Sequence, residues 1–592
     1  MKLTDDQQAL VDAQDSLFAA ACPGAGKTRA MVARFLKRTA EEGRRGIALI
    51  SFTNAAVDEV RRRCGNQVEA LRAPHFVGTF DTFIHRFIVT PMYVKWYNQK
   101  PNYVRSWREI PSTSFRLDNM GRARSLEFEW FDFDPDGRAH LDLSRVPQEF
   151  GNEDAHRMLG RRKREAEGEA SEIFWRLVKA GTISCEAARL AAEYWLSSDK
   201  ARTALAALLQ ARFAEVIVDE AQDCGREELH ILRFLHDCGV RVVMVGDLDQ
   251  SIYEFRNATP AAVQEFAATL PGPPLELRDN WRSSPAICEF NRALRSGQLV
   301  ETARGDSSIV QAPVHLIEFS SLDQIVAAAL DVAEQYKLTA DDLVILSHAH
   351  THGMKAAGVV SLESTGNNRV LSIANAGFKL RARETDPKTR RKAVEQVKRT
   401  LLAALAVGQD TKDHGFAVAC DNLGIDTRWL ESFAVWMALQ LDAEGKTRQV
   451  FAAEVRDFLK TADWGEVAPP AAGDLSNLFK APSEKDWTGV ASFGDSPSIR
   501  YSTVHGVKGM EFRGVVLVLP DRLREDQVTR RTVLDDWEGD HNTEARRVLY
   551  VAGSRAEELL MCAVHRKHAA RVRNLLEVKG VPVHQVVASH LA

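Results

Sequence analysis

Residues 21–28, ACPGAGKT, have the residue types and the spacing of a loop that holds phosphate groups. The apolar run LFAA precedes this loop, and RAMVARFLKR follows it with helical periodicity. Gly24 and Gly26 let backbone N–H groups curl around phosphates, and the helix N-terminus adds partial positive charge. Lys27 would reach the β and γ phosphates, and Thr28 would ligate Mg²⁺. A chance glycine-rich turn is the alternative, which the flanking strand and helix disfavour.

The complete set of residues expected to surround the phosphates is Ala21, Cys22, Pro23, Gly24, Ala25, Gly26, Lys27 and Thr28. Only the first position departs from the usual pattern, because Ala21 stands where GxxxxGK[ST] begins with glycine.

Two carboxylates follow a second apolar strand, in the segment FAEVIVDEAQD. Asp219 ends the strand and is placed to hold Mg²⁺, and Glu220 is placed to polarise an attacking water. A solvated acidic turn is the alternative reading, since acids are common at strand ends. Together with the phosphate loop, this pair predicts hydrolysis of a nucleoside triphosphate rather than phosphoryl transfer to a metabolite.

These segments and the later GDLDQSIYEFR occur in the same order in superfamily 1 helicases of the UvrD/Rep/PcrA type, which the chain resembles. Other segments resemble further motifs of that family, namely LTDDQQALV, ISFTNAAVDEV, VGTFDTFIHRF, LRDNWRSSPAI, YSTVHGVKGMEF and EARRVLYVAGSRA. They extend in family order from residue 3 to residue 556. The resemblance implies movement on single-stranded DNA from 3′ to 5′, driven by ATP with Mg²⁺.

The resemblance also implies roles for residues near the γ-phosphate. Arg282 and Arg555 would stabilise the charge that spreads over this phosphate in the transition state. Gln250 would bond ATP and lose that bond after hydrolysis. For a single arginine outside this motif context, a surface ion pair is the more common role.

The nucleoside part of ATP is expected to meet a different set of side chains. By resemblance, Gln7 reads the adenine, while Trp281 and Arg29 sandwich its ring. Glu511 would accept a hydrogen bond from the ribose.

The side chains expected to contact nucleic acid come from four of the motifs. Aromatic rings would stack on bases and polar groups would meet phosphates. These residues are Phe52, Thr53, Asn54, Thr79, Phe80, Tyr253, Phe255, Arg256 and His505. In GDLDQSIYEFR the two aspartates are expected only to shape the turn.

Several positions depart from the family pattern without removing a group that the chemistry needs. Trp281 stands in place of tyrosine, and a larger indole can still stack. Phe255 stands in place of tryptophan. In the last motif, Ala545 replaces the second glutamate of EERR and Ser554 replaces the threonine of TRA.

The motif order predicts an α/β fold with two RecA-like lobes, each a parallel sheet with helices on both faces. Each lobe would be interrupted by a mainly helical insertion. The expected boundaries are 1–87 and 206–278 for lobe 1A, 88–205 for insertion 1B, 279–356 and 498–592 for lobe 2A, and 357–497 for insertion 2B. ATP would lie in the cleft between the lobes.

The insertions carry less specific patterns. MYVKWYNQKPNYVRSW interleaves aromatic and basic residues, which fits single-strand binding and an ordinary packed helix equally well. SLEFEWFDF and RAHLDL alternate across DPDG and predict a β-hairpin. Insertion 2B is shorter than is typical of the family, so duplex engagement is less strongly indicated than ATP hydrolysis.

Composition is that of a soluble, globular protein, with 45% hydrophobic and 27% charged residues. The net charge of −4 does not by itself indicate a nucleic-acid-binding protein, although such binding depends on where charges cluster. No apolar run approaches a membrane span, and the scattered cysteines fit a cytoplasmic location.

Two functions remain open from the sequence. The first is a DNA translocase or helicase. The second is an ATPase subunit that senses DNA ends and controls a partner nuclease, as small UvrD-like proteins do in antiphage systems such as Gabija. The short insertion and the end of the chain soon after the last motif motivate the second function, which is the alternative to the first. A small-molecule kinase explains only the phosphate loop. The choice between DNA repair and antiviral defence stays open.

Overall fold

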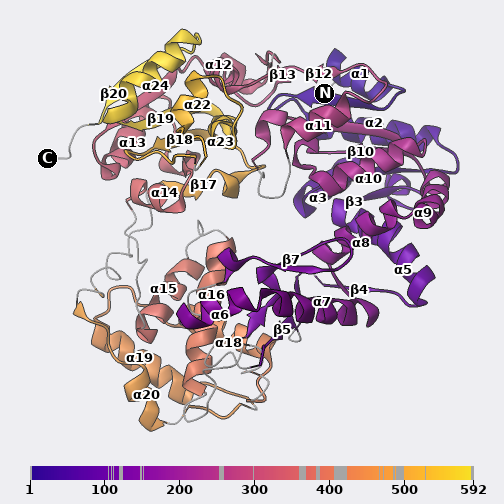
Figure 1. Cartoon of the computed structure of the whole chain (residues 1–592). Coiled ribbons are helices and arrows are strands. Elements are labelled where there is room, and N and C mark those ends of the chain that lie inside the picture. The colour runs from indigo at the N-terminus through magenta and orange to yellow at the C-terminus, as the bar shows by residue number, and fades with distance from the viewer. Residues whose placement is uncertain are drawn as a thin grey trace.

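The computed structural model contains two large parallel sheets and two smaller bodies (Figure 1). The residues that the structure describes are 3–104, 106, 107, 110, 113–118, 125–146, 150, 153–252, 259–297, 299–358, 368–381, 387–405, 416, 420, 423–465, 467–470, 472–484, 487, 499–526 and 528–588.

The first lobe is built on a six-stranded sheet in the order β12-β1-β11-β10-β2-β3, whose strand pairs are all parallel. Every residue of β2 and β10 is buried, as expected for strands covered on both faces. The strands are β1 (Leu17–Ala21), β2 (Gly46–Ser51), β3 (Phe76–Thr79), β10 (Phe213–Val218), β11 (Arg241–Gly246) and β12 (Leu275–Leu277). The helices are α1 (Asp5–Asp12), α2 (Lys27–Glu41), α3 (Asn54–Cys64), α4 (Phe80–Phe83), α10 (Arg226–Asp237) and α11 (Pro260–Ala267).

The second lobe repeats this plan with a six-stranded parallel sheet in the order β17-β16-β18-β19-β15-β20. Its strands are β15 (Val314–Phe319), β16 (Leu343–Ser347), β17 (Arg500–Thr503), β18 (Phe512–Leu519), β19 (Ala556–His565) and β20 (Val583–Val587). Its helices are α12 (Pro285–Leu294), α13 (Ile325–Gln335), α14 (His350–Ala356), α22 (Val533–Glu538), α23 (Glu544–Gly553) and α24 (Arg566–Val578). A small pair, β13 (Asp279–Asn280) with β14 (Thr302–Ala303), lies beside the first lobe. The α/β fold with two parallel sheets is confirmed.

The body between β3 and β10 mixes helices with short strands. Its helices are α5 (Thr90–Tyr97), α6 (Glu153–Arg161), α7 (Lys163–Lys179), α8 (Cys185–Ser197) and α9 (Asp199–Arg212). Its strands are β4 (Asn102–Val104), β5 (Ser114–Phe115), β6 (Leu126–Glu127), β7 (Phe131–Phe133), β8 (Ala139–Leu141) and β9 (Thr182–Ser184). The predicted hairpin is present, because β7 and β8 pair antiparallel across the Asp-Pro-Asp-Gly turn.

The body between β16 and β17 is helical over the residues described. Its helices are α15 (Arg369–Arg381), α16 (Pro387–Leu405), α18 (Thr427–Gln440), α19 (Arg448–Thr461) and α20 (Ala472–Leu478). They enclose a separate apolar core that includes Val397, Leu430 and Phe451. This body therefore has a hydrophobic core that is separate from the core of the second lobe.

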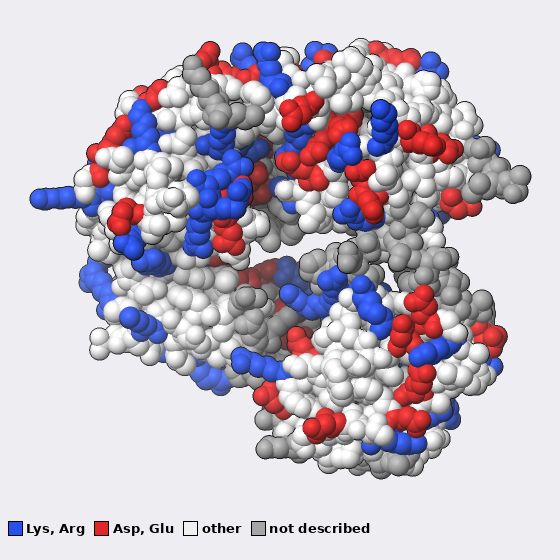
Figure 2. Space-filling model, turned by 180° about the vertical axis from the view of Figure 1, so that it is seen from behind, with Lys and Arg blue, Asp and Glu red and all other residues white. Residues whose placement is uncertain are grey.

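The two sheets lie side by side, and the two smaller bodies lie together beneath them (Figure 1). Seen from behind, a hollow separates the upper part from the lower body, and Lys and Arg side chains occur on its lower rim (Figure 2). Charge is thus locally gathered although the chain as a whole is slightly acidic. None of the helices in the described part of the chain has the length and apolarity to cross a membrane.

Candidate nucleotide site and nucleic-acid path

The phosphate loop connects the end of β1 to the start of α2, as predicted. Gly24 and Gly26 have φ angles of 68° and 71°, a region that favours glycine. A Cβ atom on Gly24 would lie 2.5 Å from Asn280 Oδ1, so a side chain would also clash there. The sequence therefore needs both glycines to expose backbone N–H groups ahead of Lys27.

Gln7 lies against this loop rather than at a distance from it. It is buried, and its Nε2 donates to the carbonyl of Ala25 at 2.9 Å. Its Oε1 accepts from the backbone N–H of Thr4 at 3.2 Å, which closes a capping box at the start of α1. Gln7 thus supports the shape of the loop, and its contact with adenine stays a prediction.

Asp219 and Glu220 follow β10, at the sheet edge where the phosphate loop also lies. Asp219 is 3% exposed and its Oδ1 accepts from the backbone N–H of Glu220 at 2.9 Å. Glu220 has a φ of 52°, a strained conformation for a residue with a side chain. Gln222 donates to the Glu220 carboxylate through its Nε2. The strand end, the turn and Gln222 together fix both carboxylates.

The electrostatics separate the roles of the two acids. Burial and the neighbouring Glu220 raise the pKa of Asp219 to about 7, against the opposing effect of Lys27. Burial alone would raise the pKa of Glu220, but Lys27, Lys508 and the Gln222 hydrogen bond outweigh it and lower this pKa. Glu220 is therefore ionised at neutral pH, as a general base must be.

The donor chemistry around the loop fits Mg²⁺ with a triphosphate. Asp219 offers carboxylate oxygens and Thr28 a hydroxyl, which are the hard ligands that Mg²⁺ prefers. Lys27 begins α2, and its ammonium influences both acids electrostatically. These are the same residues that the sequence motifs predicted, now brought to one place from two distant segments.

The second lobe adds two arginines to this site. Arg555 is 3% exposed, and its Nη2 donates to Oε1 of Gln250 at 3.0 Å. Burial lowers its pKa to about 10, with Arg282 acting in the same direction, so it remains a cation at neutral pH. Arg282 donates to the carbonyl of Ser554 at 3.0 Å and forms an ion pair with Glu511. Glu511, which is expected to bind the ribose, is therefore paired with Arg282, which is expected to bind the γ-phosphate.

Trp281 is joined to the phosphate loop by its backbone. Its N–H donates to the carbonyl of Gly24 at 3.0 Å, and its side chain is 38% exposed. An exposed indole beside the loop offers a face for a purine. The sandwich with Arg29 stays a prediction.

Polar contacts from the second lobe hold the segments after β10 and β11. Lys508 Nζ pairs with Asp223 at 2.7 Å, and Arg547 donates to the carbonyl of Ser251 at 2.6 Å. His505, expected on the nucleic-acid path, lies 3.2 Å through Nε2 from the carbonyl of Ile252. The lobes therefore meet through motif residues, at the boundary where ATP is expected.

The expected nucleic-acid contacts of the first lobe lie at the ends of β2 and β3. Thr53 caps α3 and Asn54 begins it, both exposed. Phe52 is half-buried and stacks on Phe80, with ring centroids 5.7 Å apart. Phe80 is only 2% exposed, so it supports Phe52 from below instead of facing a base. Tyr253, Phe255 and Arg256, the other predicted contacts, lie outside the described residues.

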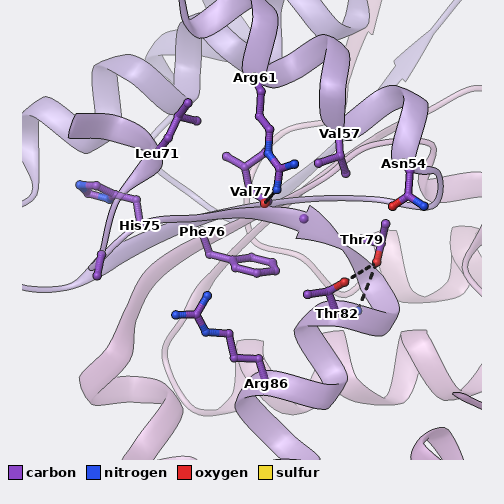
Figure 3. Close-up of a pocket in the computed structure, with 12 residues that line it drawn as sticks. Asn54, Val57, Arg61, Leu71, His75, Phe76, Val77, Thr79, Thr82 and Arg86 are labelled. Carbon is purple, nitrogen blue, oxygen red and sulfur yellow. Dashed lines mark hydrogen bonds between the residues drawn. The ribbon is translucent and has the colours of Figure 1, made fainter. Parts of the chain in front are cut away.

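A cavity of about 350 Å³ continues this path along β3 (Figure 3). Arg61 enters it from α3, which lies above the strand in the view, and Arg86 enters from the helical turn below. Arg61 donates to the carbonyl of Val77 at 3.3 Å, and Thr79 bonds Thr82 at 2.8 Å. Neither arginine was expected at the site from the sequence. Arg61 lies two helical turns from Asn54, and that spacing is the signal that places both on one face.

The aromatic segment after α4 is mainly structural. Tyr93 is fully buried and its hydroxyl bonds the carbonyl of Val178, while Trp107 is 4% exposed. Tyr103 stacks on His85 with centroids 3.9 Å apart. Trp96 is the aromatic residue of this segment that is clearly exposed among those described. The packed-helix alternative therefore accounts for most of the pattern.

Comparison with known proteins finds a matching family model and relatives that are named as helicases. Residues 3–271 match the model of the UvrD/REP helicase N-terminal domain. YjcD of Bacillus subtilis, named as an ATP-dependent DNA helicase, is 22% identical over 59% of the chain and 46% of its own length. DNA helicase II of Escherichia coli is 27% identical over 49% of the chain and 40% of its own length. The matched regions thus span less than half of these relatives.

A shorter match comes from a different kind of protein. An ATP-dependent helicase/nuclease subunit of Desulfitobacterium hafniense is 36% identical over 107 residues, which are 16% of the chain and 8% of that protein.

Proposed function

The chain belongs to the UvrD/Rep-type helicases, whose N-terminal domain it carries over residues 3–271, and on that premise we propose that it is an ATP-driven motor that moves along single-stranded DNA from 3′ to 5′. The observation that carries this proposal is the hydrogen bond between Arg555 of the second lobe and Gln250 of the first. It ties a charge-stabilising arginine to the sheet that bears the phosphate loop. Loss of the γ-phosphate after hydrolysis would therefore affect residues of both lobes.

The chemistry assigns a task to each side chain. Glu220 accepts a proton from the attacking water, and Lys27 neutralises charge on the β and γ phosphates. Arg555 and Arg282 stabilise the charge that develops during phosphoryl transfer. Thr28 and Asp219 would hold Mg²⁺, which supplies charge neutralisation at the phosphates. Arg282 would exchange its bond to Glu511 for one to the phosphate.

The four bodies correspond in this proposal to subdomains 1A, 1B, 2A and 2B, with the boundaries given by the sequence. Single-stranded DNA would cross the first lobe at Phe52, Asn54 and Thr79. The cavity with Arg61 and Arg86 continues this line, which supports phosphate contacts there.

The first test is the ATPase rate with and without single-stranded DNA. We expect DNA to stimulate hydrolysis by the unaltered chain. Phe52→Ala should raise the DNA concentration for half-maximal stimulation about tenfold, because a base–aromatic stack contributes about 1–3 kcal/mol. Tyr194→Ala, which removes a 42% exposed ring from α8, is the matched control and should leave that concentration unchanged. Absence of any stimulation by DNA would refute the motor.

The second test addresses the two arginines of the cavity. The double variant Arg61→Gln/Arg86→Gln should weaken single-strand binding and flatten the plot of log affinity against log salt. The expected change in slope is about 1.4, because each phosphate contact on a single strand contributes about 0.7. Binding titrations between low and moderate salt measure this slope. Arg573→Gln, on the surface of α24, is the control and should not change the slope. An unchanged slope in the double variant would show that DNA does not contact the cavity.

A second candidate function is a regulatory ATPase that controls a nuclease. It is favoured by the match to a protein named as part of a helicase/nuclease, over a small part of the chain. It predicts little strand displacement by the chain alone on 3′-tailed or 5′-tailed duplexes. It also predicts a stable complex with a separate nuclease. Processive unwinding of long duplexes by the purified chain would leave this candidate without support.

A further inference from the structure

A buried polar cluster joins the two lobes behind the nucleotide site. Its members are Asp247, Asp249, Gln250, Arg295 and Tyr550, here called the Asp247 cluster, and none of them is more than 8% exposed. The first three follow β11 in the first lobe. The other two belong to the second lobe, at the end of α12 and on α23.

One oxygen of Asp247 is the centre of this cluster. Its Oδ2 accepts from Gln250 Nε2 at 3.0 Å, from the Tyr550 hydroxyl at 2.7 Å and from Arg295 Nη2 at 3.3 Å. Arg295 also donates to the Tyr550 hydroxyl and pairs with Asp249 at 3.3 Å. Oδ1 of Asp247 accepts from the backbone N–H of Asp249 at 3.3 Å, which is the turn-shaping role expected from the sequence.

The charges in the cluster support this arrangement. Burial raises the pKa of Tyr550, so its hydroxyl stays protonated and can donate to Asp247. Burial alone would lower the pKa of Arg295, but Asp247, Tyr550 and Asp249 outweigh it and raise this pKa. A permanent cation and a hydroxyl donor therefore face the carboxylate from the second lobe.

The orientation of the Gln250 amide follows from its two neighbours. An ionised carboxylate only accepts hydrogen bonds, and a guanidinium only donates them. Nε2 of Gln250 therefore faces Asp247, and Oε1 faces Arg555 Nη2 at 3.0 Å. A reversed amide would set donor against donor and acceptor against acceptor. Asp247 thus holds the Nε2 end of the amide and favours the orientation in which Oε1 meets Arg555.

Asp247 is connected to the general base as well. Its backbone N–H donates to Oε1 of Gln222 at 3.0 Å, and Nε2 of Gln222 donates to Glu220. Hydrogen bonds therefore run without a break from Glu220 to Arg555, through Gln222, Asp247 and Gln250. This path crosses from the first lobe to the second.

We infer that Asp247 is a positioning residue for ATP hydrolysis, which orients the Gln250 amide and through it Arg555, and that Tyr550 and Arg295 hold Asp247 from the second lobe. The inference rests on the proposed ATPase activity. It adds three residues to which the motifs gave no such role.

Steady-state ATPase kinetics with saturating single-stranded DNA test this role. Asp247→Asn should lower kcat about 10- to 100-fold, as loss of a residue that orients a catalytic group does. Tyr550→Phe should lower kcat about threefold to tenfold, the effect of one hydrogen bond. The KM for ATP should change less than about twofold, because neither side chain binds ATP. Tyr336→Phe, which removes a hydroxyl bonded to His315 in the second lobe, is the matched control and should keep the full kcat.

A double-mutant cycle separates positioning from general damage. In the Gln250→Ala background, Asp247→Asn should lower kcat less than about twofold further, because the amide that it orients is gone. Damage to the fold would multiply the two losses instead. An unchanged kcat in Tyr550→Phe, or losses that multiply in full, would overturn the positioning role while leaving the proposed function standing. Tyr550→Phe keeps the ring and decides the matter if Asp247→Asn does not fold. If the unaltered chain hydrolyses no ATP, the proposed function itself fails.

Discussion

Replacing Arg555 with alanine is expected to lower kcat for ATP hydrolysis about 1,000-fold, with a much smaller change in KM for ATP. A guanidinium that stabilises the transition-state charge of phosphoryl transfer contributes about 10³ or more in rate, and a factor of 1,000 corresponds to about 4 kcal/mol. Arg555 is buried beside Gln250 and lies within the electrostatic reach of Glu220, so hydrolysis should depend strongly on its charge. Single-turnover and steady-state ATPase assays measure the loss.

Two further variants give this experiment its controls. Arg555→Lys keeps the positive charge but not the planar set of donors, so an intermediate rate is expected. Arg573→Ala removes an exposed guanidinium from α24 and should leave kcat unchanged. A kcat for Arg555→Ala within tenfold of the unaltered chain would show that Arg555 does not stabilise the transition state.

Glu220→Gln is expected to separate ATP binding from ATP hydrolysis. The amide is nearly the same size as the carboxylate but cannot accept the proton of the attacking water, so kcat should fall about 100- to 10,000-fold. Affinity for ATP should be kept, because Lys27 and the phosphate loop remain. Equilibrium binding of a fluorescent ATP analogue, alongside the ATPase rate, measures both quantities.

The matched control for this variant is Glu265→Gln, an exposed position on α11. It changes the net charge in the same way and should leave hydrolysis intact. If Glu220→Gln hydrolyses ATP at the normal rate, the general base must be another group, and the assignment of Glu220 is wrong.

Much of the fold was predictable because the central strands are buried on both faces. The segments around Val216 and Val243 are continuous apolar runs, and they form β10 and β11. Two edge strands lack such a run. β12 has only three residues, and β20 has two adjacent polar residues, His584 and Gln585, among its valines along a half-exposed edge. Short strands and edge strands are only partly buried, so their sequences lack the continuous apolar runs that identify central strands.

The candidate site was predictable where its chemistry is local. The phosphate loop, Asp219 and Glu220 lie within short segments whose residue types have few other uses together. The Asp247 cluster has no such signal, because Arg295 and Tyr550 are ordinary residues until the fold brings them to Asp247. The aromatic segment shows the converse: Tyr93 and Trp107 suited stacking by composition, but the structure uses them as core.

Displacement of streptavidin from single-stranded DNA biotinylated at one end tests most directly whether the chain is a motor. We expect ATP-dependent release from the 5′ end, faster than spontaneous dissociation, and no acceleration at the 3′ end. Glu220→Gln should abolish the release while still binding both DNA and ATP. DNA binding by the unaltered chain with no acceleration at either end, and no stimulation of its ATPase by DNA, would contradict the proposed motor.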